Sequence, residues 1–115
     1  MFTIRNLHLT SSPPKNLQDL DFIADTGFSG SVVSDTSIIQ SLDRDYLGDK
    51  EVTLAGGIAQ SVSVYISDVF VNTLGLKDVE IVEMGEEYLI GIALMRAISK
   101  RAIFAFDNDE VLFED

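Results

Sequence analysis

The chain has 115 residues, 46% of them hydrophobic, with a mean hydropathy of +0.21. This length and composition support one domain, residues 1–115, with a single core, and they exclude an intrinsically disordered chain. The formal net charge is -11, from 19 acidic and 8 basic residues, and it argues against nucleic-acid and membrane-surface partners because it repels phosphates.

Several residue types that carry common chemistry are absent. The chain has no cysteine and one histidine, His8, so disulfides, Cys/His zinc sites and thiol nucleophiles are excluded, and we expect no metal and no cofactor. We expect His8 at an exposed strand position. No apolar run approaches the roughly 20 residues that span a bilayer, and the N-terminus lacks a signal-peptide pattern, so we expect a cytoplasmic protein.

The first elements form a predicted hairpin. Apolar residues alternate imperfectly over residues 2–9, and the polar, turn-forming residues 11–16 follow. A second apolar segment over residues 17–24 runs directly into Asp25-Thr26-Gly27. Two such segments around a polar loop are typical of a β-hairpin.

The middle of the chain alternates strands with turns. Val32-Val33 predicts a short strand, and Ser34 to Thr36 offer N-caps for a brief helical turn through Leu42. We expect residues 43–50, which are rich in charge, to form a surface loop. Val52 to Ala55 and the alternating valines from Val62 predict two strands closed by a Gly56-Gly57 turn.

The remaining elements are short. They are a strand at residues 79–82, an apolar strand at residues 88–90 that ends at Gly91, an amphipathic helix over residues 92–98, and a hairpin that turns at residues 107–109. Many short strands with one late helix predict an all-β, barrel-like domain with one short C-terminal helix.

One acidic residue stands out by its position. Asp25 directly follows an apolar strand and precedes Thr26 and Gly27. A carboxylate at the end of a core strand is costly to bury, which makes it a candidate for acid–base chemistry. The alternative is a structural Asp that caps a turn while Gly27 supplies the special backbone angles.

Three motifs in order carry a resemblance to a known family. Asp25-Thr26-Gly27-Phe28-Ser29-Gly30 resembles the active-site signature of retropepsin-like aspartic proteases, and its Phe-Ser-Gly ending is most similar to small prokaryotic members. The hairpin around Gly56-Gly57-Ile58 resembles the family's flap. Leu89-Ile90-Gly91 with the helix after it resembles the family's hydrophobic-hydrophobic-glycine motif. The resemblance covers residues 17–106 and implies a retropepsin-like acid protease barrel.

The resemblance also implies a mechanism. Each domain carries one catalytic Asp, so two chains would pair as a homodimer and bring two copies of Asp25 together across a twofold axis. The two carboxylates would share one proton, and the ionised one would activate a water that attacks the peptide carbonyl. The protonated one would donate to the carbonyl oxygen. The implied partner is a peptide or protein substrate, and the implied activity is that of an aspartic endopeptidase.

The resemblance assigns supporting roles to the other motif residues. Thr26 would lock the two active-site loops together, and Gly27 would allow close backbone approach to the substrate. Gly56, Gly57 and Ile58 would form the flap tip. Leu89, Ile90 and Gly91 would pack beneath the Asp25 loop and hold it.

Two departures separate this chain from the retroviral enzymes. Those enzymes usually have an acidic residue where Ser29 stands and an Arg where Ile92 stands, so their ion-pair network near the dimer interface does not form here. The C-terminal hairpin also differs from their short terminal strand. The alternative function is therefore a non-catalytic or latent retropepsin-like module that binds a protein or peptide partner.

Overall fold

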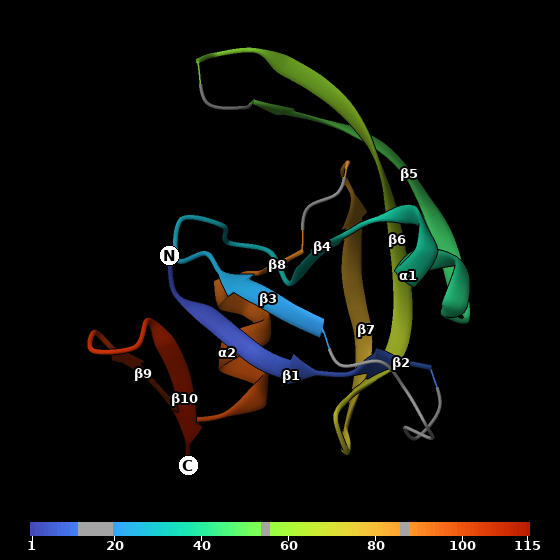
Figure 1. The fold of residues 1–115 in the computed structure, drawn as a ribbon. Helices are drawn as coiled ribbons and strands as arrows, with labels where there is room; N and C mark the ends of the chain where they lie inside the picture. The colour runs from blue at the N-terminus through green and yellow to red at the C-terminus, as the bar shows by residue number, and fades with distance from the viewer. Residues whose placement is uncertain (12–19, 54–55, 86–87) are drawn as a thin grey trace.

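The structure is a computed structural model that describes residues 1–11, 20–53, 56–85 and 88–115. These residues form one mixed β-sheet with two short helices (Figure 1). The strands are β1 (Thr3–Leu7), β2 (Leu9–Thr10), β3 (Leu20–Ala24), β4 (Val32–Ser34), β5 (Arg44–Thr53), β6 (Ala59–Val71), β7 (Leu74–Glu83), β8 (Leu89–Ile90), β9 (Arg101–Ala105) and β10 (Glu110–Glu114), and the helices are α1 (Thr36–Ser41) and α2 (Ile92–Ile98). The predicted predominance of β-structure is confirmed.

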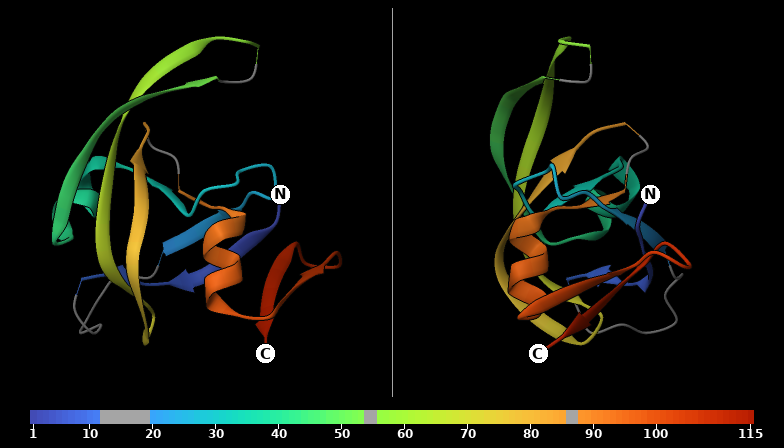
Figure 2. Two further views of the ribbon diagram at one scale, coloured as in Figure 1. Left: turned by 180° about the vertical axis from the view of Figure 1, so that it is seen from behind. Right: turned by 90° about the vertical axis from the view of Figure 1, so that its left-hand side faces the viewer.

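The sheet runs in the order β2-β6-β7-β4-β8-β3-β1-β10-β9, and β5 pairs with β6 outside this path. β9 pairs antiparallel with β10, so the predicted C-terminal hairpin is present. β1 pairs antiparallel with β3 as predicted, but β2 lies between them in the sequence and pairs with β6 instead. β1 also pairs in parallel with β10, which brings the two ends of the chain together. Two views in Figure 2 show α2 against one face of β1 and β3.

The core has two parts. The main cluster packs residues from most strands and from both helices around Phe22, Ile81 and Ile90, which are 0% exposed. A smaller cluster, which we call the valine cluster, consists of Val33, Val62, Val64 and Val82. Phe28, Val52, Met84 and Leu89 are packed against the valine cluster from its margin.

β6 contributes to both clusters because it buries opposite faces at its two ends. Toward its start the buried apolar side chains stand at even positions, such as Val64, and near its end they stand at odd positions, such as Val71. Successive side chains of a strand point to opposite faces, so β6 passes from one cluster to the other. The β6–β7 register shifts at this change of face, and the extra residue of the bulge lies in β7, between Leu76 and Val79.

The charged segment 43–50 is not the predicted surface loop. Residues from Arg44 onward form β5, which pairs antiparallel with β6 from Arg44↔Ser67 to Thr53↔Ala59. Most side chains of β5 are exposed, so its charges remain in water while the backbone hydrogen bonds to β6. Tertiary pairing therefore decides the conformation here, because charge alone does not prevent an exposed strand.

The structure has a second helix where the sequence predicts only a brief helical turn. The Asp35 side chain caps α1: Oδ1 accepts hydrogen bonds from the Ile38 amide (3.1 Å) and the Ser37 hydroxyl (2.9 Å). Oδ2 accepts from the Tyr88 hydroxyl at 2.5 Å, and the Tyr88 ring packs edge-on against Phe22. These bonds, with that of Tyr88 first, hold the pKa of Asp35 below its ordinary value.

Some expectations are corrected or lie outside the described residues. His8 lies between β1 and β2 and is partly buried; its amide donates to Asn72 Oδ1 at 2.9 Å and its carbonyl accepts from the Asn72 amide. The predicted loop after Ser11 and the strand end at residues 54–55 lie outside the described residues. In the described part of the chain, neither helix is long and apolar enough to cross a membrane.

Asp35→Ala is expected to lower the free energy of unfolding at neutral pH by about 1 kcal/mol, the usual cost of losing an N-cap. Because folding lowers the pKa of Asp35, the carboxylate stabilises the protein above the ordinary value of 3.8 and loses this contribution as the pH falls through the folded-state pKa. The difference in the free energy of unfolding between the variant and the parent should therefore become smaller in acid. Urea denaturation across this pH range measures it, with Asp45→Ala as the exposed control; an unchanged difference would contradict the assignment.

Candidate active site

The loop that contains Asp25 crosses the end of a strand. β3 pairs in parallel with β8, and β8 pairs antiparallel with β4, so β8 lies between the two strands that the loop connects. Residues 25–31 must therefore span two strand spacings, about 10 Å. Asp25 is the first residue of this crossing, and Gly91, which follows β8, lies beneath it.

Backbone hydrogen bonds hold the loop on both sides of the crossing. The Asp25 amide donates to the Ile90 carbonyl, and the Gly91 amide donates to the Ser31 carbonyl, both at 2.9 Å. The first amides of α2 continue this pattern: Ile92 donates to the Phe28 carbonyl (2.9 Å) and Ala93 to the Gly30 carbonyl (3.1 Å). α2 has no side-chain N-cap, so the loop carbonyls satisfy amides that would otherwise lack partners.

Gly91 is required by space. A Cβ atom on Gly91 would lie 2.3 Å from the Gly30 carbonyl oxygen, 2.6 Å from the Phe28 ring and 2.7 Å from the Phe28 carbonyl oxygen. Two of these atoms are backbone, so they cannot rotate away. The absence of a side chain at Gly91 therefore sets how closely the loop rests on β8 and α2.

The Asp25 carboxylate is partly buried and partly engaged. Oδ1 accepts a hydrogen bond from the Gly27 amide at 2.9 Å, and the Phe28 amide donates to the Asp25 carbonyl at 3.1 Å, which forms a tight turn. Among the described residues, no group donates a hydrogen bond to Oδ2. This oxygen can accept a hydrogen bond from a water or a substrate. Thr26 and Gly27 are exposed beside it.

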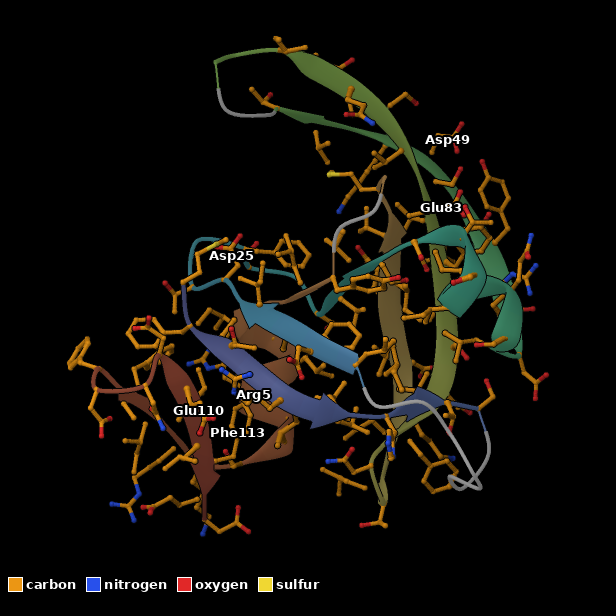
Figure 3. All side chains as sticks on the ribbon, viewed as in Figure 1. Arg5, Asp25, Asp49, Glu83, Glu110 and Phe113 are labelled. Carbon is orange, nitrogen blue, oxygen red and sulfur yellow. The ribbon has the colours of Figure 1, made fainter. Side chains whose placement is uncertain are left out.

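The predicted glycine hairpin forms the most extended feature of the molecule. Gly56 and Gly57 have φ values of 89° and 78°, which residues with a side chain rarely adopt. Ile58 is 66% exposed. In Figure 3 the β5–β6 hairpin arches on the side of the molecule where Asp25 lies. A Cβ on either glycine would meet no described atom within 4 Å, so the tip stands apart from the Asp25 loop.

Leu89 connects the loop to the base of the hairpin. It pairs with Ile23 across the β3–β8 ladder, one residue before Ala24↔Ile90. Its side chain and that of Phe28 are each packed against the valine cluster, to which the hairpin strand β6 contributes two valines. Ile90 and Gly91 are joined to the Asp25 loop by backbone hydrogen bonds, whereas Leu89 shares the valine cluster with Phe28 of that loop and with the base of the hairpin.

Sequence reasoning did not identify the carbonyls of Phe28, Gly30 and Ser31 as the groups that hold the site. Backbone acceptors cannot be recognised from the sequence, since every residue type has the same backbone carbonyl. The available signal was Gly30, because a second glycine shortly after Gly27 indicates close packing. A Cβ on Gly30 would lie 2.5 Å from the Phe28 ring.

The arrangement supports acid–base chemistry by a carboxylate. The described residues contain no group of three or more His, Cys, Asp or Glu side chains that could hold a metal ion.

A scan against protein-family models finds no match for this chain, and searches of the curated proteins and of the solved structures find none either. The interpretation of the site therefore depends on its own geometry.

Gly91→Ala is expected to destabilise the protein by about 1–3 kcal/mol or more, because the added methyl group overlaps two backbone carbonyls. Thermal or urea denaturation measures the change. Gly75→Ala is the matched control, since a Cβ there meets only the Phe70 side chain at 3.4 Å. Equal stability of the two variants would show that the loop does not rest on Gly91 as described.

Proposed function

We propose that the protein is an aspartic endopeptidase of the retropepsin-like type, with Asp25 as its catalytic residue. The observation that carries the proposal is the Asp25 carboxylate: one oxygen is held by the Gly27 amide, and the other accepts no hydrogen bond from a described residue. Backbone hydrogen bonds to residues 90–93 hold the loop around it: the Ile90 carbonyl accepts from the Asp25 amide, and the next three amides donate to loop carbonyls. A catalytic carboxylate needs such fixed placement and an accessible oxygen.

The topology supports a retropepsin-like barrel. The loop after β3 crosses β8 before β4 begins, and a glycine without room for a side chain lies directly beneath the crossing. The long β5–β6 hairpin then rises on the side of Asp25 (Figure 3). This combination agrees with the ordered motifs at Asp25, Gly56 and Leu89.

The proposed reaction requires two chains. One carboxylate cannot be general base and general acid in the same step, and each chain has one Asp25 in this position. Two copies that meet across a twofold axis would share one proton, because two adjacent carboxylates do not both ionise at low cost. The ionised copy would take a proton from water as that water attacks the peptide carbonyl. The protonated copy would donate its proton to the carbonyl oxygen.

The proposed substrate is an extended peptide that lies between the Asp25 loop and the β5–β6 hairpin. Gly56 and Gly57 have no side chains to restrict their backbone and would let the tip bend. The exposed Ile58 would cover apolar parts of the peptide. Closure of such a hairpin excludes water from the reacting groups.

A second candidate function is peptide or protein binding without hydrolysis, by a non-catalytic or latent module. Within one chain, the described residues place no second carboxylate in hydrogen-bond contact with Asp25, so the two candidate functions differ in whether two chains pair. A chain that stays monomeric would keep the loop and the hairpin but lack the acid–base pair.

Asp25→Asn is expected to reduce peptide hydrolysis by about 100- to 10,000-fold, because an amide cannot exchange the proton. The fold should be retained, since the amide oxygen introduced by this change still accepts from Gly27. The measurement is kcat on a mixed peptide library, with circular dichroism as the folding test. Asp45→Asn, an exposed change on β5, is the control. Unchanged cleavage by the Asp25→Asn variant would reject the catalytic assignment.

Activity per chain is expected to rise with protein concentration through a dimer transition and then level off, because only paired chains hold two copies of Asp25. Hydrolysis rates over a dilution series, compared with the oligomeric state from sedimentation, measure this. A constant specific activity across a range in which the chain is monomeric would exclude the shared site.

A further inference from the structure

The sheet ends at β9. In the described part of the chain, β10 pairs with one edge of β9, and no strand pairs with the other edge. Figure 1 shows β9 at the outer margin of the molecule, on the side where the Asp25 loop and the hairpin tip also lie. An edge of this kind presents amide and carbonyl groups that can pair with another strand.

β9 lacks the features that usually protect a sheet edge. Its sequence, Arg-Ala-Ile-Phe-Ala, has one charge, at its first residue, and no proline or bulge. The outer strand β5, in contrast, has five charged residues out of ten. Charged side chains along an edge prevent strand pairing between molecules. The β9 edge is therefore suited to binding, whereas β5 is not.

The β9–β10 hairpin is also apolar on its exposed surface. Ile103 is 40% exposed and pairs with Leu112, which is 53% exposed. Phe106, at the end of β9, is 83% exposed and packs edge-on against Phe2 at 5.5 Å. Exposed neighbouring apolar side chains of this size mark interaction surfaces.

The charges around β9 are arranged so that two antiparallel copies of this strand attract each other. Lys100 and Arg101 stand at its beginning, and Asp107 and Asp109 follow its end. When two copies of β9 pair antiparallel near Ile103, the basic end of each copy meets the acidic end of the other. Arg101 already bonds to Glu114 in its own chain at 2.8 Å, whereas Lys100 has no ion pair among the described residues. Elsewhere the net charge of -11 opposes association of two copies.

We propose that the β9 edge is the docking site for a second copy of this chain, which pairs antiparallel with it about a twofold axis. The two sheets then continue through β10-β9-β9-β10, with Ile103 of both copies near the axis. Lys100 of each copy lies beside Asp107 of the other. The inference deepens the proposed function, on which it rests for the need to pair two chains.

A charge exchange tests this contact. Lys100→Glu and Asp107→Lys are each expected to weaken dimerisation about tenfold, because each change removes two attractive pairs across the axis and creates two repulsive ones. The double variant Lys100→Glu/Asp107→Lys is expected to return within about threefold of the parent, since it restores both pairs with reversed sign. Sedimentation equilibrium at low salt measures the dissociation constants.

Lys77→Glu is the matched control, because it makes the same charge change at an exposed position of β7 away from this edge. A wild-type chain that remains monomeric, single variants that bind as the control does, or a double variant as weak as the singles would each overturn the docking site. Peptide hydrolysis by each variant is measured in parallel. A charge exchange that behaves as expected in a protein without hydrolysis supports the docking site and rejects the proposed function.

Discussion

Helix α2 begins without a side-chain cap, and the loop that follows Asp25 supplies its missing acceptors. The amides of Ile92 and Ala93 bond to carbonyls of that loop, and the Gly91 amide bonds to Ser31. These hydrogen bonds serve both elements: the first amides of the helix gain acceptors, and the loop is fixed over β8. It is possible only because Gly91 has no side chain to separate them. The position of Asp25 depends on this contact.

The two-part core explains how a small domain carries a long projecting hairpin. The main cluster anchors the terminal strands and both helices, and the valine cluster anchors the hairpin at its base. β6 contributes to both because it buries one face near its start and the opposite face near its end. The hairpin tip, with its two glycines in the left-handed region, is left free of the core. A rigid base and an open tip suit an element that closes over a bound peptide.

Charge and symmetry act together on association. A chain with net charge -11 resists pairing with itself over most of its surface, so a contact must place opposite charges against each other. In the proposed dimer the β9 segment would do this through its order, with basic residues first and acidic residues last. A twofold axis repeats each favourable pair of an interface, and it repeats each unfavourable pair in the same way.

The sequence by itself determined the mostly β character, the antiparallel pairing of the terminal strands, the glycine turn at Gly56-Gly57 and the helix after Gly91, because alternation, turn residues and helical periodicity are local. It also singled out Asp25, by a carboxylate at the end of an apolar strand. Only the tertiary structure decided that residues from Arg44 form a strand, that Asp35 and Tyr88 are partners, and that the Phe28, Gly30 and Ser31 carbonyls hold the site. These features depend on backbone groups and distant partners that meet only when the sheet is assembled, and residue type does not encode them locally.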